Sequence, residues 1–234
     1  MNQATFEAHL LRLREQQQLS PSPRFAPDAW SLQPILNDDT AQTGFDAHYI
    51  YHTAWALRRL KAINPPYHCD FGSSLYFVVM ASAIVPLVFG DYRPPAFDLP
   101  DLKVVSVNLT ATGLADASLP SVSCMHVVEH VGLGRYGDPI DYEGDLLAMR
   151  ELKRIVAPGG SLLFVVPIGH PRIVYNAHRI YGYGQILETF TDRFDLADFA
   201  LITDEGRFIP GAPSTLAESQ TYGCGCFHFI ARHS

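Results

Sequence analysis

Two histidines and a glutamate follow a short apolar run near the middle of the chain. They are His126, Glu129 and His130, and a second pair, His178 and Arg179, lies further along. An imidazole with an ordinary pKa near ~6.5 can take a proton at neutral pH, which an oxygen nucleophile requires before it attacks. We therefore expect Glu129, His130 and His178 to act as bases or orienting groups, and Arg179 to contact an anionic group. A structural acid–histidine hydrogen bond is the alternative.

The loop after His130 is dense in glycine and acidic residues. Its sequence over residues 132–145, GLGRYGDPIDYEGD, lacks the Lys-Ser/Thr of a phosphate loop and the ligand spacing of a calcium loop. We expect instead a shaped loop that presents polar side chains to a substrate. These side chains are Arg135, Tyr136, Asp138 and Asp141.

Two patterns resemble metal sites, and neither meets the requirements of one. His126, Glu129 and His130 have the spacing of an inverted zinc-peptidase motif, but they fall on a predicted strand end and loop, whereas the motif requires a helix. Cys224-Gly-Cys226 is a single pair, whereas structural zinc usually takes four ligands in paired spacing. We expect no bound metal and interpret these cysteines as small residues that enter the last strand.

A strand–helix–strand unit positions the central cluster. Residues 121–128 and 161–166 are short, apolar and β-branched, as the buried strands of a parallel sheet are. Between them, residues 141–156 alternate charged and apolar side chains at helical spacing, with acids early and bases late, as the helix dipole prefers. Residues 158–160, Pro-Gly-Gly, end this helix. The unit predicts an α/β fold, whose sheets bind ligands at the carboxyl ends of their strands.

The remaining elements follow from the same patterns. Helices are expected over residues 4–18, 46–62, 75–84 and 184–190, a first strand and its loop over 67–74, and further strands over 85–90, 102–107, 198–203 and 226–232. The first two helices predict an N-terminal helical extension, residues 1–64, that packs on or caps an α/β domain, residues 65–234.

Composition narrows the partners. The net charge of −7 argues against sequence-independent binding of nucleic acid, which needs a basic face. The longest apolar run, residues 75–89, contains Pro86 and is shorter than the roughly 20 residues of a membrane helix, and the N-terminus lacks a signal-peptide pattern. Four cysteines do not make a disulfide framework in a chain of this size. We expect a cytoplasmic protein without a membrane span.

The central unit resembles class I S-adenosylmethionine-dependent methyltransferases. The resemblance rests on a strand ending in His-Val-Val-Glu-His, a helix reading Arg-Glu-Leu-Lys-Arg-Ile-Val-Ala-Pro-Gly-Gly and an apolar strand ending in Pro167. More narrowly, residues 132–141 (GLGRYGDPID) and 176–179 (NAHR) are similar to the uncharacterised domain-of-unknown-function family 268, a methyltransferase-like branch. The resemblance covers roughly residues 65–210. It implies a three-layer αβα sandwich with a mostly parallel, seven-stranded, Rossmann-like sheet, whose last strand enters antiparallel between the sixth and the fifth.

The resemblance also implies S-adenosylmethionine as the cofactor. The residues that it places against the cofactor are Asp70, Gly72, Ser73, Ser74, Asp91, Asn108, Leu109 and His126. Asp70 and Gly72 match the family's acidic position and first glycine, where the backbone approaches the cofactor. Asp91 follows about 20 residues later and is expected to accept two ribose hydroxyls, with plain turn chemistry as the alternative. Asn108 and Leu109 are expected to meet the adenine.

Together these observations predict a methyltransferase that acts on a small-molecule or carbohydrate-like acceptor. No Asn/Asp-Pro-Pro-Tyr motif follows the predicted fourth strand, which favours oxygen over adenine or amide nitrogen as the methylated atom. A homodimer is left open. One alternative is a non-catalytic binding or scaffold protein of the same fold, favoured by Ser74 and Tyr76, which stand where further glycines are common. A metal-dependent hydrolase is a further alternative, and the only feature that favours it is the spacing of His126, Glu129 and His130.

Overall fold

Two units make up the chain in the computed structural model, which describes residues 1–26 and 28–233. The smaller unit, Met1–Phe45, contains α1 (Gln3–Leu19), which begins after Asn2 because the Asn2 side chain accepts a hydrogen bond from the Thr5 amide. The structure describes every residue of α1, and none of them is buried. The larger unit is Asp46–Ser234, so the division falls after Phe45, whereas the sequence analysis places it at residue 64.

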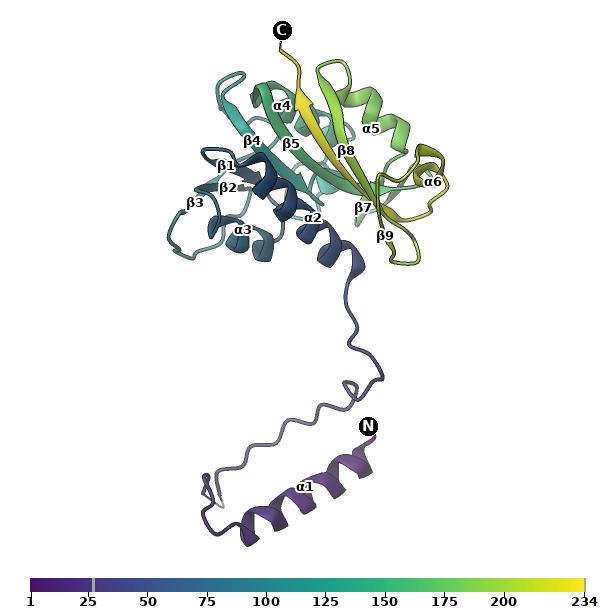
Figure 1. Cartoon of the computed structure of the whole chain (residues 1–234). Helices are drawn as coiled ribbons and strands as arrows, with labels where there is room; N and C mark the ends of the chain where they lie inside the picture. Colours follow the sequence, from purple (N-terminus) through teal and green to yellow (C-terminus); the bar gives the residue numbers. More distant parts are fainter. Residues whose placement is uncertain (27, 234) are drawn as a thin grey trace. The chain divides into compact units, whose positions relative to one another are not determined.

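An eight-stranded sheet forms the centre of the larger unit, in the order β3-β2-β1-β4-β5-β10-β8-β9 (Figure 1). Its strands are β1 (His68–Phe71), β2 (Leu87–Asp91), β3 (Leu102–Ser106), β4 (Leu119–Met125), β5 (Val156–Ile168), β8 (Phe194–Ile202), β9 (Phe208–Pro210) and β10 (Gly223–Ala231). The pairs among β1 to β5 are parallel, whereas β10 runs antiparallel to both β5 and β8. A separate ribbon pairs β6 (Arg172–Val174) with β7 (His178–Ile180).

This strand order confirms the predicted α/β class and the antiparallel entry of the last strand between its two neighbours. The expected number of seven strands is wrong by one. The additional strand is β9, which pairs antiparallel with β8 at the edge of the sheet in a stretch for which no strand was predicted. Because β9 is three residues long and pairs through its backbone, its side chains gave no alternating pattern to detect.

Helices cover both faces of the sheet. They are α2 (Ala47–Ile63), α3 (Leu75–Ser82), α4 (Gly144–Ile155), α5 (Tyr183–Phe190) and α6 (Ser214–Glu218), with a short 3₁₀ turn, η1 (Val128–His130), after β4. One apolar cluster joins α2 and α3 to the sheet through Trp55, Leu60 and Phe77. A second cluster, which includes Leu152 and Phe190, joins α4 and α5 to the sheet. The arrangement is the expected three-layer αβα sandwich (Figure 1).

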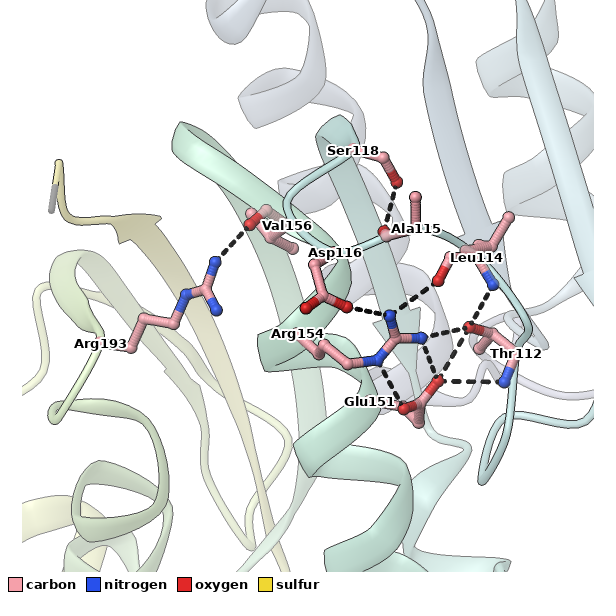
Figure 2. A network of polar contacts seen from close by, with 9 residues as sticks. All are labelled: Thr112, Leu114, Ala115, Asp116, Ser118, Glu151, Arg154, Val156 and Arg193. Carbon is pink, nitrogen blue, oxygen red and sulfur yellow. Dashed lines mark hydrogen bonds and ion pairs between the residues drawn. The ribbon is translucent and has the colours of Figure 1, made fainter.

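Arg154 ties the end of α4 to the loop that leads into β4 (Figure 2). Its Nε and Nη2 donate to the two oxygens of Glu151, both at 2.8 Å, and its Nη1 donates to the Leu114 carbonyl at 2.7 Å. The Glu151 carboxylate also accepts from the backbone amide of Thr112 at 3.0 Å. The Arg154 guanidinium is the main cause that lowers the pKa of Glu151 to about 2. This network fixes the loop before β4, and His126 directly follows β4.

Within the described parts of the chain, no helix has both the length and the apolar character needed to cross a bilayer.

Candidate functional site

A cavity of about 270 Å³ opens where β1, β2 and β3 end. We call it the strand-end cavity, and its lining includes Gly72, Asp91, Asn108, Leu109, Val127, His130, Tyr136, Asp138 and Asp141. Parallel sheets bind ligands at this edge because the carboxyl ends of their strands and the loops that follow meet there. Four predicted cofactor residues, Gly72, Asp91, Asn108 and Leu109, therefore lie around one space.

The loop after β1 bends at Gly72 and approaches the cavity with bare backbone. Gly72 has φ +70°, and a Cβ atom there would lie 3.0 Å from Val127 Cγ1, so a side chain would be both strained and crowded. The buried Asp70 holds the turn by accepting from the Ser73 amide at 3.0 Å and from the Ser123 hydroxyl. Ser73 in turn accepts from the Met125 amide at 3.1 Å, which ties this loop to the end of β4.

Asp70, Ser73 and Ser74 do not belong to the described lining of the strand-end cavity. Asp70 and Ser73 act on it through the turn at Gly72 that they hold. Burial raises the pKa of Asp70 to about 6, against the hydrogen bonds from Ser123 and Ser73, which lower it. Ser74 caps α3 by accepting from the Phe77 amide at 3.3 Å. The Tyr76 side chain, 84% exposed, points to solvent, so a tyrosine at a common glycine position does not narrow the cavity.

Two polar side chains meet the cavity after β2 and β3. Asp91 ends β2, and its Oδ1 accepts from the Arg93 amide at 2.6 Å, which leaves Oδ2 for a ligand. Asn108 uses its Oδ1 inside its own turn, where it accepts from the amide and the hydroxyl of Thr110 at 3.0 and 2.9 Å. Asp91 is therefore the stronger hydrogen-bonding group of the two toward a bound molecule.

A second cavity of about 450 Å³ lies beside the first. We call it the histidine cavity, and its lining includes Asp46, His48, Tyr49, His126, Glu129, His130, Arg135, Tyr136, His178 and Tyr222. Three of the predicted catalytic residues, Glu129, His130 and His178, meet here. Because His130 and Tyr136 line both cavities, the two spaces adjoin at these side chains.

His130 sits at the junction in a defined orientation. Its Nδ1 lies 2.6 Å from the Ala177 carbonyl oxygen, which assigns the ring proton to Nδ1 and leaves Nε2 able to accept one. Burial lowers the pKa of His130, so the ring is neutral near pH 7. Burial also lowers the pKa of His178, whose ring stacks on Tyr222 with centroids 5.1 Å apart. Two neutral imidazoles therefore face the histidine cavity.

His126 lies in the histidine cavity and not in the strand-end cavity where the resemblance places it, as far as the described lining extends. Its backbone has φ +56°, which is uncommon for a residue with a side chain. Nδ1 lies 2.9 Å from Glu129 Oε1 and Nε2 lies 3.4 Å from Cys224 Sγ. Burial by itself lowers the pKa of His126, but Cys224 and Glu129 outweigh burial and raise it.

Arg179 lies outside both cavities and lines a separate one of about 330 Å³, so its predicted contact with an anionic group stays a prediction. Its side chain is buried, and it donates to the carbonyl oxygens of Val131 at 2.6 Å and Tyr142 at 3.0 Å. Its Nε also lies 3.5 Å from the Asp145 carboxylate. Arg179 thus fixes both ends of the loop between η1 and α4.

The four residues predicted to bind substrate divide between the cavities. Arg135 lines the histidine cavity, Asp138 and Asp141 line the strand-end cavity, and Tyr136 lines both. Asp138 accepts from the Gly132 amide at 2.7 Å and Asp141 from the Glu143 amide at 2.9 Å, so both also shape the loop. Arg135 donates to the Ala177 carbonyl at 3.0 Å.

Sequence reasoning missed the side chains that α2 and Tyr222, the residue before β10, bring to the histidine cavity. His48 and Tyr49 come from the first turn of α2, which begins after Asp46 because that carboxylate accepts a hydrogen bond from the Tyr49 amide. Their rings lie 5.6 and 5.4 Å from that of His126, centroid to centroid. The four-residue spacing of His48 and His52, which places both on one helical face, was the available signal.

Residues 116–200 match the model of the family described as Caenorhabditis protein of unknown function, DUF268, which confirms the resemblance to that family. A search of the curated proteins found no match.

Solved structures of methyltransferases share the fold. N-methyltransferase NodS from Bradyrhizobium japonicum WM9, in complex with S-adenosyl-L-homocysteine, has a TM-score of 0.56 and 13% identity over 95% of this chain and 98% of that chain. 1,6-Didemethyltoxoflavin-N1-methyltransferase from Burkholderia thailandensis has a TM-score of 0.51 and 11% identity over 80% of this chain and 84% of that chain. A chain of the complex that contains the Haloferax volcanii Trm112 methyltransferase activator has a TM-score of 0.55 and 18% identity over 81% of this chain and 91% of that chain. At these identities the similarity shows the class I methyltransferase fold alone.

Proposed function

We propose that this chain is an S-adenosylmethionine-dependent methyltransferase that transfers the methyl group to oxygen of a small-molecule or carbohydrate-like acceptor. The observation that carries the proposal is the pair of adjoining cavities, one with the features of a nucleoside site and one with neutral imidazoles, which meet at His130 and Tyr136. When bound, S-adenosylmethionine would supply an electrophilic methyl group on its sulfonium.

The strand-end cavity fits this cofactor in three respects. Gly72 leaves backbone exposed at the end of β1, in a conformation that suits glycine. Asp91 has a carboxylate oxygen available at the end of β2, and a carboxylate accepts the two hydroxyls of a ribose. The apolar side chains of Val107, Leu109 and Val127 line the cavity and are suited to a planar base.

The histidine cavity would hold the acceptor beside the methyl group. His130 Nε2 is free to take the proton of an acceptor hydroxyl, because Nδ1 is engaged with the Ala177 carbonyl. Arg135 and Tyr136 would orient the acceptor, and Glu129 would orient His126 and stand 3.8 Å from His130 Nε2. General base assistance of this kind typically contributes about 10²- to 10⁴-fold to a rate.

Calorimetric titration with S-adenosylmethionine and S-adenosylhomocysteine tests the cofactor site. We expect the unmodified chain to bind both, and Asp91→Ala to bind at least about tenfold more weakly because hydrogen bonds to a charged group are lost. Gly72→Val is expected to abolish binding, since its Cβ would press on Val127. Asp98→Ala is the matched control, because Asp98 is an exposed aspartate of the next loop that does not line the cavity. A folded, unmodified chain that binds neither molecule would favour the non-catalytic scaffold instead.

Transfer of a labelled methyl group to a panel of hydroxylated small molecules and sugars tests the acceptor class. His130→Gln is expected to lower kcat about 10²-fold or more while leaving the affinity for S-adenosylhomocysteine within about twofold. Label that appears on nitrogen or on protein would contradict the oxygen acceptor. A cytoplasmic location also stays a prediction, which the four free cysteines support.

A further inference from the structure

Three side chains from distant parts of the sequence place metal-binding atoms together at the inner end of the histidine cavity. They are His48 at the start of α2, His126 after β4 and Cys224 on β10, and one nitrogen or sulfur atom from each lies within 4.8 Å of those of the other two. We infer that His48, His126 and Cys224 form a binding site for a single zinc ion. This inference does not depend on the proposed methyl transfer.

The distances agree with zinc geometry. In a tetrahedral site with Zn–N of about 2.0 Å and Zn–S of about 2.3 Å, a nitrogen and a sulfur ligand lie about 3.5 Å apart. His126 Nε2 and Cys224 Sγ lie 3.4 Å apart. The ligand atom of His48 lies within 4.8 Å of both, so metal binding requires a rotation of the His48 side chain, which lines the open cavity. Thiolate and imidazole are the ligands that zinc prefers.

The Glu129 carboxylate orients one of the three side chains, as residues next to the ligands of a metal site commonly do. A metal-bound histidine usually donates its other ring N–H to a carboxylate or carbonyl, which fixes the ring. His126 has this arrangement, with Nδ1 2.9 Å from Glu129 Oε1. The Glu129 Oε2 atom is buried and has no hydrogen-bond partner among the described residues, although buried polar atoms rarely stay unpaired.

The position of the site suggests how the metal would act. Three protein ligands with a fourth open position are typical of zinc sites that bind an exchangeable molecule, whereas structural sites are closed by four protein ligands. His48 and His126 both line the histidine cavity, so the fourth position faces that space. The ligand for it would be an oxygen, nitrogen or sulfur atom of whatever molecule the cavity holds.

The test uses the full, untagged chain, freed of metal with a chelator and then titrated with Zn²⁺ and with Co²⁺. We expect one metal per chain by elemental analysis after zinc loading, and a thiolate-to-cobalt charge-transfer band after cobalt loading. Cys224→Ser should remove that band and weaken zinc binding at least tenfold. Cys124→Ser is the matched control, because Cys124 is an equally buried free thiol, and it should keep both properties.

If Cys224→Ser does not fold, two further variants still test the zinc site. His48→Gln, at the partly exposed start of α2, should weaken zinc binding tenfold or more, and Glu129→Gln should weaken it 10- to 100-fold through His126. His170→Gln, an exposed histidine, is their control and should leave the affinity unchanged. Substoichiometric metal in the unmodified chain, absence of the charge-transfer band, or zinc affinity that survives both His48→Gln and Cys224→Ser would overturn the inference.

Discussion

At the scale of single residues, the strand-end cavity depends on buried polar side chains that lie outside its described lining. Asp70 is fully buried, holds the turn at Gly72 and shares the Ser123 hydroxyl with His68, whose Nε2 lies 2.8 Å from that oxygen. Burial raises the pKa of Asp70 to about 6 and lowers that of His68 to about 3. Both groups are therefore linked to the pH dependence of stability.

Asp70→Asn tests this linkage. The pKa of Asp70 rises from 3.8 to about 6 on folding, so between these values the folded chain keeps a proton that the unfolded chain releases. The contribution of Asp70 to stability therefore falls as pH rises from about 4 to 6, by up to about 3 kcal/mol. Urea unfolding from pH 4 to 7 should show the stability of the unmodified chain declining relative to Asp70→Asn. Parallel pH profiles for the two chains would refute this, and Asp98→Asn, at an exposed aspartate, serves as the control.

At the scale of elements, the ribbon of β6 and β7 braces the loop that both cavities share. Arg179 on β7 reaches the carbonyls of Val131 and Tyr142, which lie before and after the glycine-rich segment. Asp141 donates its backbone N–H to the Gly132 carbonyl at 3.0 Å, which closes the loop on itself. The loop is thus positioned by a strand that follows it in sequence.

Arg179→Met should destabilise the chain by roughly 3–5 kcal/mol, because it leaves Asp145 buried without its charged partner. Amide hydrogen exchange of residues 132–141 should also speed up, since the carbonyls that hold the loop lose their donor. Arg172→Met on the neighbouring strand is the matched control and should cost less than about 1 kcal/mol, because Arg172 is exposed. An equal loss of stability in the two variants would contradict the bracing role.

At the scale of the whole molecule, both apolar clusters lie within the larger unit. The first member of either cluster along the chain is Ala47, and the last is Ala231. Trp55 of α2 also donates to Asp198 of β8 at 3.0 Å. The larger unit therefore contains its own core, and α2 is part of that core.

A fragment of residues 46–234 should fold alone and unfold cooperatively, with a midpoint within about 2–4 °C of that of the full chain. A fragment of residues 65–234 should be strongly destabilised, because it lacks Trp55 and Leu60, which are almost fully buried. Thermal unfolding followed by circular dichroism distinguishes the two. Equal stability of the two fragments would mean that α2 is dispensable.

The sequence by itself determined most of the helices and strands of the α/β domain, β6, β7 and β9 excepted, and the edge at which its polar residues collect. Apolar β-branched runs and helical periodicity are local properties, so the strand that ends at Asp91 could be predicted, and with it the positions of Gly72 and Asp91. A strand before the histidines could be predicted too, although the prediction carried it to residue 128 and β4 ends at Met125. The parallel order and the antiparallel last strand came from the resemblance of the central segment.

Only the tertiary structure decided which side chains share a space. Arg179 has the residue type and position of an anion contact, yet it is buried against carbonyls, because partners 34 to 48 residues away satisfy it. His48 and Cys224 carry no signal near His126 in the sequence, since α2 and β10 reach it through packing on the sheet. A local pattern specifies the element on which a side chain lies, but the distances between side chains from different elements depend on long-range packing.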